Sequence, residues 1–167
     1  MQLSPFKDRT FRMLTIFDCD GVLVDSELIS LSELSDMMGE YGVPMTLSEC
    51  QDAYMGLHSA DIIRAIEGRI GRALPGEGAL MRARMIDRLK RELKPVPGIA
   101  DALTRLEGPR CVASSSDRAR IELTLELTGL ADFFAGHLFS GTEVACGKPA
   151  PDLFIHCLLY TSDAADE

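Results

Sequence analysis

Short apolar runs alternate with segments of helical periodicity along most of the chain. The first run, residues 13–17, is apolar and β-branched and ends abruptly in an acidic turn, which is typical of a buried parallel strand that opens into a loop. Two more runs, at 111–113 and 137–139, each follow a segment of helical spacing, at 99–106 and 118–128. Strand, helix, strand, helix, strand with short connections predicts a doubly wound, Rossmann-like parallel α/β sheet.

A block of purely helical pattern separates the first apolar run from the second. Apolar residues recur at helical spacing in four stretches: 27–41, 46–54, 59–70 and 80–93. The last stretch has the clearest apolar stripe, with arginine and lysine residues on its other faces. Pro95 and Pro97 then punctuate the chain. We expect residues 27–94 to form an all-helical cap inserted into the core after its first strand.

The remaining residues divide into a discontinuous core and a tail. The core comprises residues 12–26 and 95–156, and we expect its sheet to be incomplete because no strand follows the helix that opens at Pro151. Residues 157–167, CLLYTSDAADE, do not continue the pattern and resemble the translation of a sequencing adapter. We interpret them as a non-native tail and exclude them from the fold, with a native tail as the alternative.

Composition and charge narrow the class of protein. Of the 167 residues, 46% are hydrophobic and 26% are charged, which is typical of a globular chain. The net charge of −9 argues against nucleic acid or an anionic membrane as the main partner. No apolar run approaches the ~20 residues of a membrane span, and the N-terminus lacks a signal-peptide pattern, so we expect a cytoplasmic protein and a monomer. The five scattered cysteines are expected to be reduced thiols.

Two acidic residues carry the strongest chemical signal. Asp18 and Asp20 stand two residues apart just past the first strand, so their side chains point the same way at the edge where α/β sheets bind ligands. Their mutual repulsion makes a divalent cation favourable between them. One carboxylate could act as a nucleophile and the other as an acid/base. Gly21 supplies the freedom that a sharp exit from a strand often needs. A solvated acidic turn is the alternative.

These acids belong to a segment, FDCDGVLVDSE, that resembles the first motif of the haloacid dehalogenase (HAD) superfamily of phosphotransferases. Ser114, at the end of the second apolar run, is similar to the Ser/Thr of the second motif. Lys148, in GKPAPD, is similar to the lysine of the third. The intervals between the motifs suit a member with a helical cap after the first strand. The resemblance covers about residues 13–156 and is greatest to the branch of small phosphatases and β-phosphoglucomutase.

The resemblance implies a mechanism at the matching positions. Asp18 would be the nucleophile that forms an aspartyl-phosphate, and Asp20 would protonate the leaving oxygen and then activate water. The carboxylate of Asp18 and the backbone carbonyl of Asp20 would also hold Mg²⁺, the expected cofactor. Ser114, Ser115 and Lys148 would bind the phosphoryl group. From the residues alone, Ser114 could instead cap the next helix, and Lys148 could be a solvated loop residue.

The cap offers one candidate for substrate contact. His58 lies between two expected cap helices, where relatives carry a substrate-reading loop. It is either a contact to substrate or a plain surface histidine. Because this loop holds no strong cation, it argues against a second bound phosphate, which a mutase needs.

One motif of the superfamily is missing from its expected place. The fourth motif is an acidic pair that supplies further Mg²⁺ ligands, and it is expected well past Lys148, where this chain has entered the tail. Asp163 and Asp166 are not assigned to it. The sequence predicts a Mg²⁺-dependent phosphatase of a small phosphorylated metabolite such as a sugar phosphate. A phosphoglucomutase-like isomerase and an inactive truncated fragment are the two alternatives.

Overall fold

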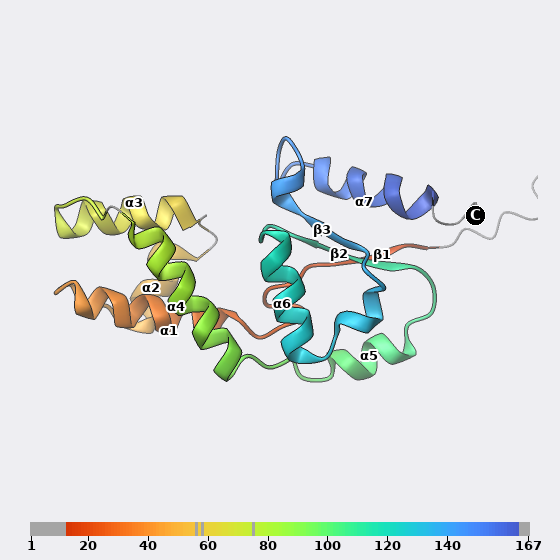
Figure 1. Ribbon diagram of the computed structural model, residues 1–167, viewed down its shortest axis with the longest axis horizontal. Helices are drawn as coiled ribbons and strands as arrows, with labels where there is room; N and C mark the ends of the chain where they lie inside the picture. The colour runs from red at the N-terminus through yellow and green to blue at the C-terminus, as the bar shows by residue number, and fades with distance from the viewer. Residues whose placement is uncertain (1–12, 56, 58, 75, 164–167) are drawn as a thin grey trace, which may run out of the picture. The chain divides into compact units, whose positions relative to one another are not determined.

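The computed structural model describes residues 13–55, 57, 59–74 and 76–163, and its elements follow the predicted order (Figure 1). In chain order they are β1 (Thr15–Phe17), α1 (Glu27–Glu40), α2 (Leu47–Tyr54), α3 (Ser59–Ile70), α4 (Glu77–Glu92), α5 (Ile99–Arg105), β2 (Arg110–Ser114), α6 (Arg118–Thr128), η1 (Ala131–Phe134), β3 (Leu138–Ser140), η2 (Gly141–Glu143) and α7 (Asp152–Asp163).

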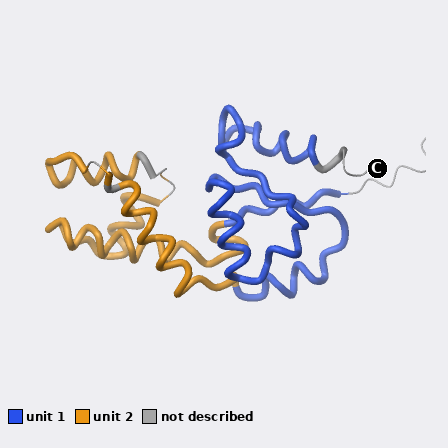
Figure 2. The backbone as a smooth tube through the Cα atoms, in the orientation of Figure 1, with its two compact units in different colours: residues 1–19, 97–167 blue, residues 20–96 orange. Residues whose placement is uncertain are grey.

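The chain forms two compact units, which are coloured separately in Figure 2. We call residues 1–19 with 97–167 the core unit, and residues 20–96 the cap unit. The cap unit takes in the two segments that connect it to the core as well as its helices. Each unit has its own buried apolar cluster, as a compact folding unit requires.

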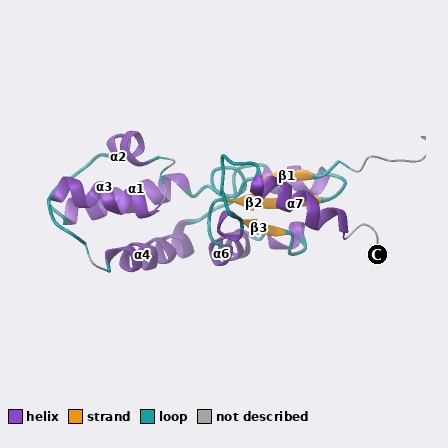
Figure 3. Cartoon of the chain, turned by 90° about the horizontal axis from the view of Figure 1, so that it is seen from above, coloured by secondary structure: helices purple, strands orange, loops and turns teal. Residues whose placement is uncertain are grey.

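The core unit is built on a parallel sheet with the strand order β1-β2-β3. Ile16 pairs with Cys111, and Ala113 pairs with Phe139. Helix α7 covers one face of the sheet, and α5 and α6 cover the other (Figure 1 and, from above, Figure 3). The parallel α/β fold predicted from the alternating pattern is confirmed. Because the carboxyl ends of parallel strands share one edge, the residues that follow β1, β2 and β3 gather there.

Beneath α7, the sheet contributes to a small apolar cluster of Cys111, Ala113, Phe139, Leu153 and Cys157. Helix α7 runs to Asp163 and so includes the first residues of the segment that the sequence analysis sets aside. Cys157, in that segment, is fully buried. A hydrogen bond with Cys157, together with burial, raises the pKa of the Cys111 thiol. The five cysteines, all among the described residues, form no disulfide. Among the described residues, no helix is long and apolar enough to cross a bilayer.

The cap unit packs α1, α2 and α3 around a second cluster, which includes Leu34, Met38 and Ile66, and α4 lies against α1 and α3. Thr46 begins α2 with a capping box: its hydroxyl accepts from the Glu49 amide, and the Glu49 carboxylate accepts from the Thr46 amide. These reciprocal bonds satisfy two amides that the first turn would otherwise leave open. They explain why α2 begins where its sequence predicts.

The two connecting segments of the cap unit are hydrogen-bonded to each other. Val24 and Pro95 form an antiparallel bridge. The Asp25 amide donates to the Lys94 carbonyl at 2.9 Å, and the Val96 amide donates to the Leu23 carbonyl at 3.0 Å. We call residues 23–25 and 94–96 the neck. The chain therefore enters and leaves the helical insertion at adjacent points.

Part of the polar surface of α4 lies against α1, and its apolar stripe is only partly buried. Two of its arginines, Arg84 and Arg88, do not lie on a purely solvated face but bind Glu33 of α1, whose side chain is only 7% exposed. Leu80, at the start of the expected apolar stripe, is 49% exposed, whereas Leu89 is buried. The helix packs against α1 through ion pairs as well as apolar contacts, because guanidinium groups lie flat against a partner and carry long apolar stems.

Candidate active site

Asp18 lies directly after β1, and Lys148 reaches it from the loop before α7. The ammonium Nζ of Lys148 is 3.1 Å from Asp18 Oδ1, and it donates a hydrogen bond of 2.7 Å to the Ala113 carbonyl on β2. The ring of Phe154, on α7, lies 5.7 Å from the same ammonium. Three groups from separate parts of the core unit thus hold the charge of Lys148 beside the carboxylate.

The two carboxylate oxygens of Asp18 have different surroundings. Besides Lys148, Oδ1 accepts a hydrogen bond of 2.8 Å from the Cys19 amide. Oδ2 accepts no hydrogen bond from any described residue, and the side chain is 46% exposed. One oxygen is therefore anchored, and the other is open to bind a cation or attack an electrophile.

Ser114 ends β2 and begins the loop that leads to α6. It is buried, and its Oγ accepts a hydrogen bond of 3.1 Å from the Ser116 amide, which leaves its O–H as a donor. Asp117 is the N-cap of α6, because its carboxylate accepts a 2.9 Å bond from the Arg120 amide. Ser114 is therefore not the helix cap. Ser115 is exposed.

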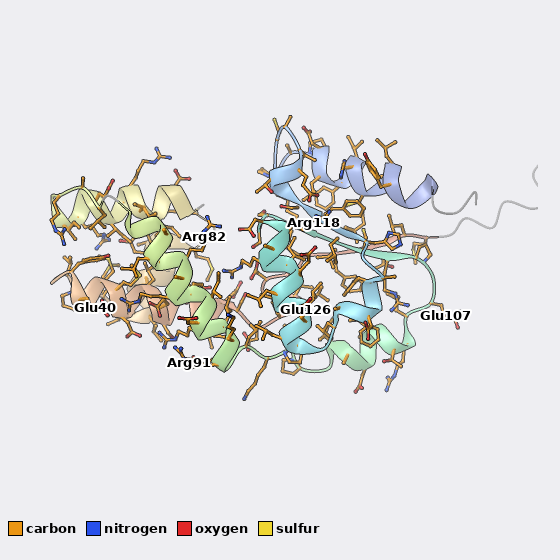
Figure 4. The ribbon with its side chains drawn as sticks, viewed as in Figure 1. Glu40, Arg82, Arg91, Glu107, Arg118 and Glu126 are labelled. Atoms are coloured by element: carbon orange, nitrogen blue, oxygen red, sulfur yellow. The ribbon has the colours of Figure 1, made fainter. Side chains whose placement is uncertain are left out.

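A salt bridge lies beside this loop at the start of α6, where Figure 4 labels Arg118. Arg118 Nε donates to Glu143 Oε1 at 2.6 Å, and a second guanidinium nitrogen donates to the Leu138 carbonyl at 2.7 Å. The hydrogen bond from Arg118 lowers the pKa of Glu143. The pair ties the first turn of α6 to η2, the short helix that follows β3.

Asp20 is the first residue of the cap unit. Its Oδ1 accepts a short hydrogen bond of 2.6 Å from the buried Ser26 hydroxyl. Gly21 follows with a φ of 75°, in the left-handed region that glycine adopts freely, and its amide donates to the Val24 carbonyl. The turn after Asp20 therefore needs the conformational freedom that the sequence predicts for Gly21.

The donor set fits Mg²⁺ in part. Among the described residues, no group of three His, Cys, Asp or Glu side chains is arranged to hold a metal. Mg²⁺ commonly binds one or two carboxylates and completes its shell with waters and substrate oxygens, so the partly exposed carboxylate of Asp18 suits it as a side-chain ligand. His58, the expected substrate contact in the cap, lies outside the described residues.

One contact at the site was not predicted, because it belongs to no sequence motif. Cys19, between the two acids, is buried, and its Sγ lies 3.6 Å from the Thr124 hydroxyl on α6. The signal in the sequence is a threonine on the apolar side of a helix, next to Ile121 and Leu125.

The structure brings two of the predicted site residues, Asp18 and Lys148, together. A third, Ser114, directly follows Ala113, whose carbonyl Lys148 binds.

The sequence profile of the haloacid dehalogenase-like hydrolases matches residues 15–164. The chain belongs to this family. Membership in the HAD family confirms the resemblance drawn from the three ordered motifs, and it agrees with the parallel α/β core.

Its named relatives include a phosphatase and a haloacid dehalogenase-like protein of unknown function. A 6-phosphogluconate phosphatase of Escherichia coli (strain K12) is 29% identical over 142 residues, which cover 84% of this chain and 64% of the relative. A haloacid dehalogenase-like protein of unknown function from Agrobacterium tumefaciens str. C58 is 34% identical, with a TM-score of 0.78 over 89% of this chain and 68% of that one.

A HAD family hydrolase from Deinococcus radiodurans R1, solved with bound phosphate and sodium, is 25% identical. Its TM-score is 0.72, over 92% of this chain and 68% of that one. The chain spans a little under two thirds of the length of the curated phosphatase that it matches.

Proposed function

We propose that this HAD-family chain hydrolyses a small phosphorylated metabolite with Asp18 as the nucleophile. The observation that carries the proposal is the ammonium of Lys148 at 3.1 Å from Oδ1 of Asp18, with Oδ2 open. A carboxylate attacks a phosphoryl dianion poorly because both are negative. A fixed positive charge beside the carboxylate offsets that repulsion, and it is already in place before substrate arrives.

The proposed reaction has two displacements at phosphorus. In the first, Oδ2 of Asp18 attacks phosphorus, the bond to the leaving oxygen breaks, and Asp20 gives that oxygen a proton. In the second, Asp20 takes a proton from a water that attacks the aspartyl-phosphate, which releases inorganic phosphate and restores Asp18. Ser114, Ser115 and the amides at the start of α6 bind the phosphoryl oxygens. Mg²⁺, held by the Asp18 carboxylate and the main-chain carbonyl of Asp20, would supply further charge neutralisation.

The class of substrate follows from the relatives. The Escherichia coli relative is named for a phosphorylated sugar acid, and the Deinococcus radiodurans structure holds phosphate. We therefore propose a sugar-phosphate-like substrate. We also propose a cytoplasmic location and a monomeric state, which suit an enzyme of small metabolites.

Hydrolysis of p-nitrophenyl phosphate by the purified chain tests the nucleophile. We expect Asp18→Asn to lower the rate by at least about 1000-fold, since an amide cannot form the acyl phosphate. Asp132→Asn, at an exposed aspartate of the same unit, should leave the rate unchanged. Removal of metal with EDTA should abolish hydrolysis, and MgCl₂ should restore it.

Equal rates for the wild-type chain and Asp18→Asn would remove the nucleophile assignment. A panel of sugar phosphates then separates the reaction classes. Release of inorganic phosphate supports the phosphatase, whereas interconversion of hexose phosphates without release would support the mutase alternative. Absence of turnover on every substrate would support the alternative of an inactive chain.

A further inference from the structure

The end of β3 is built against the loop that follows β2. Ser140, the last residue of β3, is fully buried, and its Oγ donates a hydrogen bond of 2.7 Å to the Ser116 carbonyl. At the next position, a methyl group on Gly141 would lie 3.3 Å from Ser115 Cα and 3.4 Å from the Ser114 carbonyl oxygen. Ser140 thus holds the loop through a hydrogen bond, and Gly141 lies close to the backbone of the loop.

Ser140 is itself held in place. Its Oγ accepts a hydrogen bond of 3.1 Å from the Thr142 amide and lies 2.8 Å from the Thr142 hydroxyl. The Ser140 amide donates to Glu143 at 3.1 Å, and Glu143 is bound by Arg118 of α6. This hydrogen-bonded corner joins the end of β3 to the first turn of α6, and the loop from Ser114 to Ser116 comes just before that turn in the chain.

A fully buried hydroxyl at this place calls for an explanation. The two preceding residues of β3, Leu138 and Phe139, are buried and apolar, so an alanine at position 140 would continue the strand without a polar group to satisfy. The hydroxyl instead bonds to a main-chain carbonyl in the neighbouring loop. This hydrogen bond fixes the path of the loop that follows β2.

We propose that Ser140 and Gly141 are positioning residues for phosphate binding, and that they act through the loop of residues 114–116. This inference rests on the proposed function, because the loop is proposed there to bind the phosphoryl group. Neither residue is assigned contact with substrate. A loop that presents a hydroxyl and amides to an anion binds well only if its path is set beforehand, since ordering it on binding would cost affinity.

Binding of inorganic phosphate to the full chain tests the proposal, measured by titration calorimetry and by KM and kcat on p-nitrophenyl phosphate. We expect Ser140→Ala to weaken phosphate binding about fivefold to tenfold, as loss of one organising hydrogen bond allows, and to raise KM. Gly141→Ala, which adds one methyl and removes no hydrogen bond, should weaken binding by a similar factor because it pushes the loop from the same side.

The matched control is Thr128→Val. The Thr128 hydroxyl donates to the Thr124 carbonyl at 2.7 Å, so this variant loses a hydroxyl-to-carbonyl bond of the same length at the far end of α6. We expect its melting temperature to fall much as that of Ser140→Ala does, while its phosphate affinity stays at the wild-type value. A loss of affinity confined to positions 140 and 141 separates positioning from general stability.

The possible results distinguish a failure of this inference from a failure of the proposed function on which it rests. If the wild-type chain binds no phosphate, the proposed function fails and the inference fails with it. If the wild-type chain binds phosphate and both Ser140→Ala and Gly141→Ala bind it equally well, only the inference is overturned. If Ser140→Ala does not unfold cooperatively, the phosphate affinity of Gly141→Ala alone tests the inference.

Discussion

A single ammonium joins the ends of two strands at the candidate active site. Lys148 has three N–H donors, and among the described residues two are used by Asp18 and the Ala113 carbonyl. In the proposed reaction the third would bind a phosphoryl oxygen. A planar guanidinium cannot share its donors in this way, because its N–H groups are fixed in one plane. We therefore propose that the lysine contacts Asp18 and a bound phosphate at the same time.

Lys148→Met tests this arrangement, since methionine keeps the unbranched stem and removes the charge. We expect kcat/KM for p-nitrophenyl phosphate to fall by about 100-fold to 1000-fold, the range found when one preorganised charge or donor is removed. Lys148→Arg should recover only part of this loss. Steady-state kinetics give the measurement, and a methionine variant within twofold of wild type would contradict it.

Single residues were predicted unevenly by the sequence. Asp18 and Lys148 were found because side chains of particular types stand in a recognisable order. The Ala113 carbonyl and the Cys19 amide could not be found, because every residue has these groups and only the fold aims them. Thr124 was hidden for a related reason: its partner is more than a hundred positions away in the chain.

At the scale of elements, helix ends were predicted well because their signals are local. The capping box at Thr46 and the left-handed glycine at Gly129 are each contained within a few residues. The residues that pack against the polar face of a helix can be far away in the chain, so no local signal identifies them. Arg84 and Arg88 follow each other by one turn of α4, and nothing near them in the chain shows that Glu33 of α1 lies against them.

This cluster of ions holds α1 to α4. Arg84 also binds Glu40 through two nitrogens, at 2.7 and 2.9 Å, and Arg88 binds Asp36 at 2.6 Å. Figure 4 labels Glu40 near the end of α1. Glu33 is the buried member that both arginines share, whereas Glu40 is largely exposed. The two acids should therefore contribute unequally to stability.

We expect Glu33→Gln to lower the free energy of unfolding by about 2 kcal/mol, because it leaves two partly buried guanidinium groups without their common carboxylate. Glu40→Gln, the matched variant at the exposed end of the same cluster, should cost less, since water replaces its carboxylate. Urea unfolding curves measure both. The expectation is contradicted if Glu40→Gln is the more damaging change.

For the whole molecule, an excess of acid sets the response to pH. The net charge is −9, and three described glutamates, Glu40, Glu49 and Glu143, have a pKa below the usual 4.5 because hydrogen bonds favour their ionised form. A carboxyl group whose pKa is lowered by folding stabilises the protein fully above the unfolded pKa. That contribution disappears as the pH falls through the folded value.

We therefore expect the melting temperature to change little between pH 7 and 5 and to fall steeply below about pH 4.5. Thermal unfolding followed by circular dichroism at a series of pH values makes the measurement. Glu143→Gln should flatten the acid limb, because Arg118 then has no carboxylate to lose. Glu126→Gln, at an exposed glutamate of α6 (Figure 4), serves as the control. A stability that held constant down to pH 3 would refute this account.

The neck has a consequence for how such a protein can diversify. Because residues 23–25 and 94–96 are bonded side by side, the chain closes the same short gap whatever lies between them. The entropy of closing a loop rises only slowly with its length, so the bracketed segment can grow, shrink or be exchanged at little thermodynamic cost. Replacement of the segment between the two segments of the neck can thus change substrate selectivity, while the register of β1 with β2 stays the same.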